Sequence, residues 1–270
     1  MPTRIELKGR TAIITGAASG IGRAIAHSLA RRGCHVALAD VNEAGLQETA
    51  SSAASGVRIT CHRLDVGDAQ AIAAAPGIVR AEHGGIDLLV NNAGVALGGT
   101  FEQVSAADFE WLIAINFFGV VRMTRAFLPL LRASDDARIV NISSIFGIIA
   151  PPGQTAYSAS KFAVRGFSEA LRNELEGTSI GVSVVHPGGV ATSIARNARR
   201  SESASPEVLA ATLAGIEAKL KMPPAQAGET IVRAVEQRKP RIIVGRDAKV
   251  IAMIERFAPV SYWKVLERMR

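Results

Sequence analysis

Short apolar runs alternate with amphipathic stretches along most of the chain. The runs occupy residues 11–15, 35–40, 57–65, 86–92, 137–143, 180–186 and 241–245. Between them, apolar positions recur at helical spacing, as in residues 21–33 and in a longer stretch from about 105 to 131 that has Pro129 close to its end. This alternation is typical of strand–helix–strand units, which build parallel sheets. We therefore expect an α/β fold with a doubly wound, seven-stranded parallel sheet.

No internal repeat or low-complexity linker divides the chain. We expect a single domain over residues 1–245, followed by a basic, amphipathic extension over residues 246–270. Ligands of doubly wound sheets bind beyond the carboxyl ends of the strands. The residues that follow each strand are therefore the first candidates for chemistry.

The segment TGAASGIG is a glycine-rich turn between the first apolar run and the first helical stretch. Gly16, Gly20 and Gly22 allow a tight turn and let backbone N–H groups approach an anion at the start of the helix, where the helix dipole is favourable. A glycine-rich turn in isolation is as often a flexible loop. Its place between a strand and a helix predicts dinucleotide binding.

Asp40 ends the second apolar run, twenty residues after Gly20. A carboxylate there can accept hydrogen bonds from both hydroxyls of an adenosine ribose, whereas a 2′-phosphate would meet like charge. No Arg or Lys stands at positions 17, 18, 41 or 42 to offset that charge. The sequence therefore favours NAD over NADP. The alternative for Asp40 is a solvated strand end or a helix cap, a role that fits Asn42 almost as well.

The composition, 48% hydrophobic and 20% charged residues in 270, is that of a globular protein. No uninterrupted apolar run reaches the roughly 18 to 20 residues of a membrane helix, and the polar start lacks the apolar core of a signal peptide. We therefore expect a cytoplasmic protein, with Cys34 and Cys61 reduced. The five histidines show no metal-ligand spacing, so we expect no metal site.

The net charge of +7 is concentrated at one end of the chain. Residues 1–195 hold 16 Lys+Arg and 16 Asp+Glu, whereas residues 196–270 hold 15 and 8. A basic region can attract phosphates, nucleic acid or an anionic membrane. Here the charges are scattered among Ala, Leu and Ile at helical spacing, which favours a solvated helix face, and we expect no nucleic-acid partner.

Taken in order, the motifs resemble those of the short-chain dehydrogenase/reductase family, in its single-domain branch. The resemblance runs from Gly9 to about Thr192. It implies a Rossmann fold, a nicotinamide-dependent oxidoreductase and a homodimer or homotetramer. The residues that match cofactor contacts are Gly16, Ser19, Gly20, Ile21, Gly22, Asp40, Asp65, Val66, Asn92, Ala93, Gly94, Tyr157, Lys161, Pro187, Gly188, Val190 and Thr192.

Asn116, Ser144, Tyr157 and Lys161 match the catalytic residues of the family. Residues four apart share one face of a helix, so Tyr157 and Lys161 would project into one site. The ordinary pKa of a phenol is about 10, and we expect the ammonium, together with the positive nicotinamide ring, to lower it by about 3 units. Tyr157 would then exchange a proton with the substrate oxygen as hydride moves. An isolated Y-x-x-x-K is more often a surface pair, and only the other motifs favour the catalytic interpretation.

Three of these assignments have an alternative. Ser143 competes with Ser144, but a strand alternates its faces, so only one of the two should face the site. Asn116 lies inside the long helix and could hold a water relay to Lys161 or a buried hydrogen bond at a kink, and both need a local distortion. Thr192 could bind the nicotinamide carboxamide or cap the next helix.

The expected substrate pocket is apolar and carries no charged group. Its candidate walls are Ile145, Phe146, Ile148, Ile149, residues 151–153, Val95, Ala96 and Leu97. The polar segment within a substrate lid of about 190–222 is helix-poor, as a mobile lid would be, although Arg196, Arg199 and Arg200 could instead meet an anionic tail of a substrate. We expect a hydrophobic secondary alcohol or ketone.

The extension repeats apolar residues at helical spacing, first Val250, Ile251, Ile254 and Phe257, then Tyr262, Trp263, Leu266 and Met269. An ordinary family member ends soon after the seventh strand. Three uses stay open: packing against a partner subunit, covering the pocket, or peripheral contact with an anionic membrane surface, which is possible but not favoured.

The leading interpretation is an oxidoreductase that transfers hydride between NAD(H) and a hydrophobic secondary alcohol or ketone, with Tyr157 as general acid/base. The alternatives are an NADP-dependent carbonyl reductase and a non-catalytic, dinucleotide-sensing protein. Sugar-nucleotide epimerases share the Y-x-x-x-K spacing, but they carry a differently spaced glycine turn and a longer substrate domain.

Overall fold

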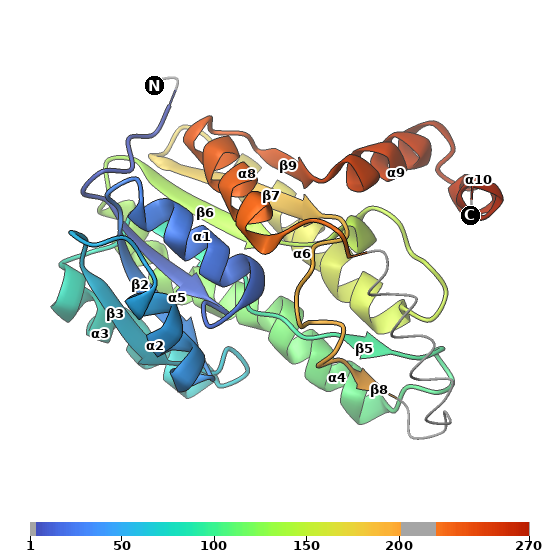
Figure 1. Cartoon of the computed structure of the whole chain (residues 1–270), viewed down its shortest axis with the longest axis horizontal. Helices are drawn as coiled ribbons and strands as arrows, with labels where there is room; N and C mark the ends of the chain where they lie inside the picture. The colour runs from blue at the N-terminus through green and yellow to red at the C-terminus, as the bar shows by residue number, and fades with distance from the viewer. Residues whose placement is uncertain (1–3, 201–219, 270) are drawn as a thin grey trace.

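A computed structural model describes residues 4–200 and 220–269 of the chain. Its main sheet has seven parallel strands in the order β3-β2-β1-β4-β6-β7-β9 (Figure 1). The strands are β1 (Thr11–Thr15), β2 (His35–Asp40), β3 (Ile59–Arg63), β4 (Leu88–Asn91), β6 (Ala137–Ile142), β7 (Ile180–Pro187) and β9 (Arg241–Val244). Each strand falls on one of the seven apolar runs, so the expected parallel sheet is confirmed.

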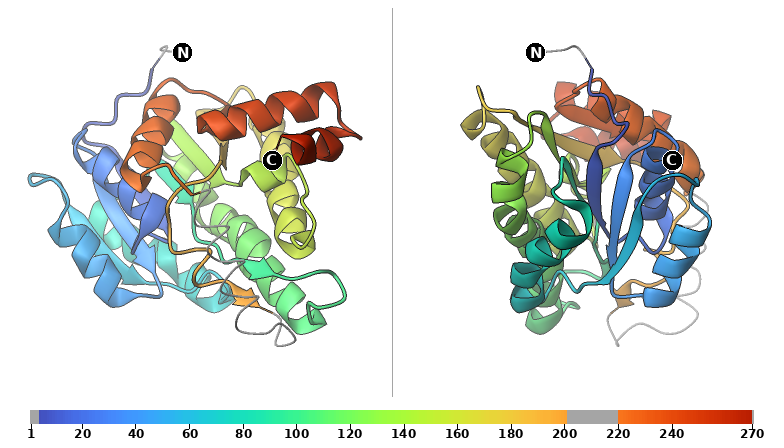
Figure 2. Two further views of the ribbon diagram at one scale, coloured as in Figure 1. Left: turned by 45° about the vertical axis from the view of Figure 1, so that its right-hand side comes forward. Right: turned by 90° about the vertical axis from the view of Figure 1, so that its left-hand side faces the viewer.

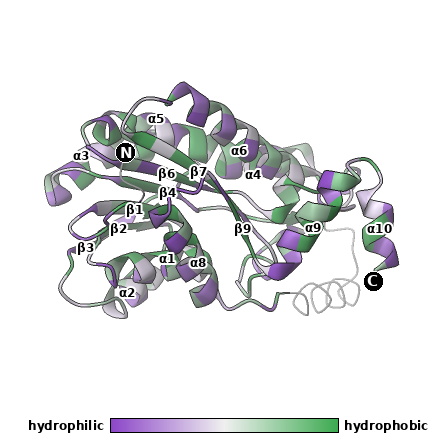
Figure 3. Cartoon of the chain, turned by 90° about the horizontal axis from the view of Figure 1, so that it is seen from above, coloured by the Kyte–Doolittle hydropathy of each residue, from purple (hydrophilic) through white to green (hydrophobic). Residues whose placement is uncertain are grey.

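Helices cover both faces of this sheet (Figure 3). One face carries α1 (Gly20–Ala30), α2 (Glu43–Ser51) and α8 (Pro224–Glu236), and the other carries α3 (Ala69–His83), α5 (Gly119–Arg132) and α6 (Thr155–Glu174). Neighbouring strand residues enter different cores: Ile14 packs with α1 and α8, and Ile13 packs with α3 and α5. Because both faces are buried, the strands read as continuous apolar runs.

A single long helix runs from residue 106 to residue 132 along one side of the sheet. It consists of α4 (Ala106–Ile113), a π-helical turn η1 (Ala114–Phe118) and α5. By length and composition it could cross a membrane. However, Met123, Phe127 and Leu131 are fully buried against the sheet, and Asn91 donates a hydrogen bond to the hydroxyl of Thr124. It is therefore a core helix of the domain.

A second, two-stranded sheet was not expected from the sequence. β5 (Leu97–Gly98) pairs in parallel with β8 (Arg199–Arg200) beside α4 (Figure 1). The Arg199 guanidinium lies 3.6 Å from the Trp111 ring centroid and pairs with Asp108 at 2.9 Å. Of the expected lid over about 190–222, residues 201–219 lie outside the described part of the chain. In the described part before residue 201, Arg199 contacts Asp108 and Trp111 of α4, so its charge already has a partner.

The C-terminal extension forms two helices, α9 (Arg246–Phe257) and α10 (Tyr262–Arg268). They lie over the segment that follows β6, which begins with the short helix η2 (Ile145–Gly147) (Figure 2, left). Ile145, Ile148 and Ile149 are buried in this contact, and the Tyr262 hydroxyl accepts a hydrogen bond from Ala150 N at 3.0 Å. The apolar positions of α9 are divided between two faces, because Ile251 packs inward whereas Val250 and Phe257 are exposed.

Candidate active site

The candidate site lies where the strand order reverses. β1 and β4 are neighbours in the sheet although β2 and β3 come between them in the chain. The chain therefore leaves β1 toward one edge of the sheet and leaves β4 toward the other edge. A crevice at the carboxyl ends of the strands is the usual ligand site of such sheets. The glycine turn follows β1, the NNAG segment follows β4, Ser144 follows β6 and Pro187 ends β7.

The glycine turn is packed too closely to accept side chains. Gly16 and Gly20 have φ of +67° and +55°, in the left-handed region that favours glycine. A Cβ on Gly22 would lie 2.0 Å from the Gly16 carbonyl oxygen, and a Cβ on Gly16 would lie 2.8 Å from Ala93 Cα. The glycines therefore leave backbone groups exposed in this cradle at the N-terminus of α1, and the hydroxyl of exposed Ser19 makes no cap hydrogen bond. The cradle fits the phosphates of a dinucleotide.

Thr15 and Asn92 hold the glycine turn against the NNAG segment. The Thr15 hydroxyl accepts hydrogen bonds from Asn92 N at 3.0 Å and Ala93 N at 3.1 Å. The Asn92 side chain donates to the carbonyl oxygens of Thr15 and Gly16 at 3.0 and 3.1 Å. The predicted cofactor residue Asn92 thus shapes the cradle with its side chain. Thr15 was missed because a threonine at the end of an apolar run looks like any strand residue.

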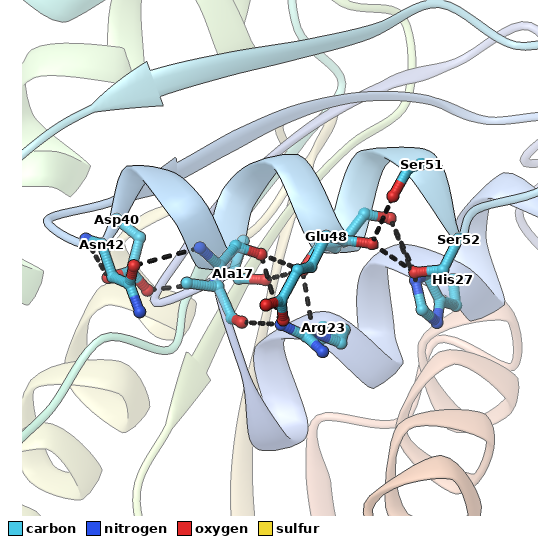
Figure 4. Close-up of polar contacts among 11 residues, drawn as sticks. Ala17, Arg23, His27, Asp40, Asn42, Glu48, Ser51 and Ser52 are labelled. Carbon is cyan, nitrogen blue, oxygen red and sulfur yellow. Dashed lines mark hydrogen bonds and ion pairs between the residues drawn. The ribbon is translucent and has the colours of Figure 1, made fainter.

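Asp40 lies beside the glycine turn, at the carboxyl end of β2 (Figure 4). Its carboxylate accepts hydrogen bonds from Ala18 N at 3.1 Å and Asn42 N at 3.0 Å. The helix-cap role belongs to Asn42, whose side chain accepts from Gly45 N at 3.0 Å at the start of α2. Asp40 is therefore fixed against the glycine turn and not used as the cap.

Arg23 is a cation near this end that the sequence interpretation missed (Figure 4). Its guanidinium donates to the Ala18 carbonyl oxygen and to the Thr49 hydroxyl, and it pairs with Glu48 at 2.8 Å. Arg23 thus already has an ion-pair partner and two hydrogen-bond acceptors within the protein. The sequence feature that could have identified Arg23 is its position one turn into α1, directly after the glycines.

The other predicted adenine-side residues follow β3. Asp65 is exposed, and its carboxylate accepts a hydrogen bond from Gly67 N at 2.7 Å. Val66 is buried and packs against Gly119, where an added Cβ would lie 3.1 Å from its side chain. Val66 therefore joins the core at the start of α5, while Asp65 stays at the surface of the crevice.

The structure brings Ser144, Tyr157 and Lys161 together at the carboxyl end of β6. Tyr157 and Lys161 lie on the first turns of α6, with Lys161 Nζ 5.6 Å from the Tyr157 ring centroid. The Ser144 side chain lies close enough to the Tyr157 phenol to lower its pKa. Lys161 is buried, and its Nζ donates to the Ile142 carbonyl oxygen at 3.1 Å.

Burial shifts both titratable groups toward their neutral forms. It raises the pKa of Tyr157 to about 12, against the opposing effect of the nearby Ser144 side chain, and it lowers the pKa of Lys161 to about 8. The lowered phenol pKa expected from the sequence does not arise in the protein alone. The physical reason is that Lys161 points its ammonium at the Ile142 carbonyl oxygen, while desolvation of Tyr157 by its neighbours disfavours the phenolate.

Ser143 and Ser144 face opposite sides, as strand alternation requires. The Ser143 hydroxyl is buried and donates to the Lys161 carbonyl oxygen at 2.8 Å, so it ties β6 to α6. Ser144 turns its hydroxyl to Tyr157 and also accepts from Phe146 N at 3.1 Å, which caps η2. The structure thus places Ser144, and not Ser143, beside the phenol.

Asn116 sits in the π-helical turn, so the expected distortion of the long helix is present. Its Oδ1 accepts from Val95 N at 2.8 Å, and its Nδ2 donates to the Val95 carbonyl oxygen at 2.9 Å and to the Ser160 hydroxyl at 3.2 Å. An added Cβ on Gly94 would lie 3.2 Å from Asn116 Oδ1 and 3.5 Å from Lys161 Nζ. Gly94 therefore separates the amide from the ammonium.

The segment after β7 closes the other side of the crevice. Gly188 N donates to the Val244 carbonyl oxygen at 2.9 Å, and Val190 is buried. An added Cβ on Gly20 would lie 3.1 Å from the Thr192 methyl group, so Thr192 stands beside the glycine turn. The described residues 193–197 form turns, and Thr192 caps no helix there.

Apolar side chains surround the Tyr157 phenol. The Phe146 ring meets the Tyr157 ring edge-on, with centroids 6.1 Å apart, and Val95 and Trp111 belong to the cluster that contacts Tyr157. Of the expected pocket walls, Ile145, Ile148 and Ile149 pack against α9 and α10. Among the described residues, no group of three or more His, Cys, Asp or Glu side chains gathers in a metal-binding arrangement.

Comparison with known proteins agrees with this geometry. The family described as short chain dehydrogenase matches residues 10–203. The chain belongs to the short-chain dehydrogenase/reductase family. It is an oxidoreductase of that family, and the order of the seven parallel strands is that of its fold.

Three similar family members cover nearly the whole chain. SadH of Mycobacterium tuberculosis, which is named as an oxidoreductase, is 41% identical over 265 residues, 97% of this chain and 95% of that protein. A Burkholderia phymatum short-chain dehydrogenase/reductase solved with NAD has a TM-score of 0.85 at 30% identity, over 94% and 95% of the two chains. A Mycobacterium paratuberculosis dehydrogenase solved with NAD has a TM-score of 0.77 at 27% identity, over 89% and 97%. The alignment with SadH reaches into the C-terminal helices.

Proposed function

We propose that this enzyme transfers hydride between NAD(H) and a hydrophobic secondary alcohol or ketone. The observation that carries the proposal is that Tyr157 and Lys161 meet beside a backbone cradle suited to a dinucleotide, with the buried Lys161 Nζ 5.6 Å from the Tyr157 ring centroid. The Ser144 side chain lies next to the same phenol. Family members solved with NAD support the same cofactor class.

The choice of NAD over NADP rests on the ribose end of the cradle. The Asp40 carboxylate is held there by Ala18 N and Asn42 N, where it would repel a 2′-phosphate. Arg23, the nearby cation, is paired with Glu48 and does not offer a free charge to that phosphate.

NAD when bound supplies the hydride acceptor, and the residues of this chain handle the proton. The Ser144 hydroxyl is placed to hydrogen-bond the substrate oxygen and to stabilise charge that develops there. In alcohol oxidation Tyr157 would accept the alcohol proton as a phenolate and become a phenol, and in ketone reduction the phenol would give its proton to the ketone oxygen and become a phenolate. Lys161 holds a positive charge behind the phenol, and Asn116 keeps the Val95 backbone and Ser160 in place around it.

An apolar substrate fits the surroundings of the phenol. Phe146 contacts the Tyr157 ring, Val95 and Trp111 pack on the same apolar cluster as Tyr157, and Arg199 is engaged with Asp108 and Trp111. Small carboxylates and phosphate esters would find no free cation among these neighbours. Hydrophobic alcohols and ketones are therefore the substrate class to assay.

The test is a panel of hydrophobic alcohols and ketones, assayed by the absorbance of reduced cofactor with NAD and NADP side by side. We expect turnover with NAD in the wild type, and a loss of about 10²- to 10⁴-fold in Tyr157→Phe, because the general acid/base is removed. NADH binding, followed by its fluorescence, should stay nearly unchanged in that variant. Retained turnover would refute the role of Tyr157.

A further inference from the structure

A groove lies between α6, β9 and α9, separate from the cradle and the phenol. Its volume is about 490 Å³, and it is lined by Arg165, Arg241, Ile243, Lys249, Ala252, Met253, Glu255 and Arg256. Arg165 follows Tyr157 by eight residues on α6, which corresponds to about 12 Å along the helix axis. The apolar cluster around η2 separates the two places.

The groove carries more positive charge than its carboxylates offset. Arg165 is the only one of its four cations with an ion pair in the described part of the chain, to Glu169 at 3.1 Å. Arg241, Lys249 and Arg256 make no hydrogen bond or ion pair with side chains of residues 4–200 or 220–269. Glu255 is the single carboxylate in the lining. Counting Glu169 as well, four cations face two anions.

The positive charges in the groove also repel one another. The pKa of the Arg241 guanidinium is lowered by burial first and then by the neighbouring charge of Arg165, with a smaller contribution from Arg256. Glu169 and Glu255 act in the opposite direction and do not cancel these effects. A bound anion would relieve this repulsion, and several converging cations in a concave site raise the local concentration of anions.

One side of the groove is apolar. Ile243, Ala252 and Met253 contribute side chains to it, and Met253 is 57% exposed. Val250 and Phe257 continue this exposed apolar stripe along α9, because residues three and four apart share a helix face. A ligand that satisfies both sides has an anionic group and an apolar part. A small inorganic ion satisfies only the charged side.

We propose that this groove binds the phosphate group of an amphiphilic organic phosphate. The phosphate lies among Arg165, Arg241, Lys249 and Arg256, where guanidinium groups provide paired donors for phosphate oxygens. The apolar part lies along Met253 toward Val250 and Phe257. A soluble phosphate ester and an anionic phospholipid share this chemistry, and the binding does not depend on which substrate the active site turns over.

The first test measures binding of dihexanoyl phosphatidic acid, below its micelle concentration, by calorimetry in saturating NAD, which blocks the cofactor cradle. Dihexanoyl phosphatidylcholine and inorganic phosphate serve as comparison ligands. We expect phosphatidic acid to bind at least tenfold more tightly than either. Equal affinity for inorganic phosphate, or no binding at all, would overturn the proposal.

The matched variants separate the groove from general basic charge. Arg241→Gln with Lys249→Gln removes two groove cations, and Lys264→Gln with Arg268→Gln removes two exposed cations of α10. The first pair should weaken phosphatidic acid binding at least tenfold, and the second should leave it unchanged. Equal losses in both would show non-specific attraction and contradict the assignment. Thermal unfolding and NADH affinity identify any variant that has lost its fold.

Sedimentation with lipid vesicles distinguishes a membrane lipid from a soluble ester as the source of the phosphate. Wild-type protein and the two double variants are sedimented with phosphatidylcholine vesicles that either contain or lack phosphatidylglycerol. Sedimentation that needs phosphatidylglycerol and is lost in Arg241→Gln with Lys249→Gln identifies a membrane lipid. Binding of soluble phosphatidic acid without such sedimentation identifies a soluble ester.

Discussion

The carbonyl oxygen of Ser144 lies 3.0 Å from Nδ1 of His186, a fully buried residue of β7. Because that oxygen only accepts, Nδ1 carries the hydrogen, and the buried Nε2 has no hydrogen-bond partner among residues 4–200 and 220–269. The backbone of the candidate active site is thus fixed by a histidine that has to stay neutral. Burial lowers the pKa of His186 to about 4.

This histidine makes folding stability depend on pH. The folded-state pKa lies below the ordinary 6.5, so the unfolded chain binds more protons between pH 4 and 6.5. The contribution is fully present above pH 6.5 and is lost as the pH falls toward 4, by on the order of 3 kcal/mol. Urea unfolding of the wild type and His186→Gln at several pH values measures it. We expect a flatter pH dependence in the variant, and parallel curves would exclude His186 as the source.

Gly22→Ala tests whether the cradle tolerates a side chain. The added methyl group would meet the Gly16 carbonyl oxygen at 2.0 Å, so the turn has to open. We expect NADH affinity to fall at least about tenfold, or 1.4 kcal/mol. Gly77→Ala in α3 is the control, because nothing lies within 4 Å of its added Cβ. It should leave NADH affinity intact and raise stability by roughly 0.5 to 1 kcal/mol.

Asp40→Asn removes a charge at the ribose end and keeps the shape of the side chain. We expect the ratio of kcat/KM with NAD to that with NADP to fall by about tenfold or more, because the repulsion of a 2′-phosphate is lost. Asn42→Ala, the control, removes the neighbouring cap of α2 and should cost about 1 kcal/mol of stability. The cofactor ratio of that variant should not change. An unchanged ratio in Asp40→Asn would mean that other groups set the preference.

Leu266→Ala tests the contact between α10 and the segment that follows Ser144. Leu266 packs on the cluster of Ile145, Ile148 and Ile149, which adjoins Phe146 at the phenol. We expect a loss of about 1 kcal/mol in unfolding free energy and a raised KM for the bulkiest substrates. Met269→Ala, at a position that is 64% exposed, should stay within about 0.5 kcal/mol of the wild type. Similar effects of both substitutions would argue against a specific role of this contact.

The sheet could be predicted from the sequence because its strands are buried on both faces. Ile13 and Ile14 enter different cores, and this double burial leaves a continuous apolar run that reads as a strand. β5 and β8 could not be predicted, since two residues each carry no periodicity. Their pairing depends on Arg199 reaching Trp111 and Asp108, which is a tertiary contact.

The site residues were predictable where motif order and strand alternation apply. Alternation separates Ser144 from Ser143, and helical spacing brings Tyr157 to Lys161. The pKa values were not predictable, because they depend on burial. The sequence gives no sign that Lys161 turns to Ile142 or that packing around Tyr157 disfavours the phenolate. His186 and Thr15 were missed for the same reason, since their roles consist of contacts with residues distant in the chain.

Asp247 links the start of α9 to the segment that follows β7. It lies in the first turn of α9, and its carboxylate accepts a hydrogen bond from Gly189 N at 2.7 Å, three residues before Thr192. α9 thus cannot shift without straining the segment beside the glycine turn. A ligand of α9 that tightens this link would change the affinity for the cofactor. Thermodynamic linkage then requires the cofactor to change the affinity for that ligand by the same factor. Affinity for the dinucleotide is in this sense a property of residues well beyond the family's common motifs.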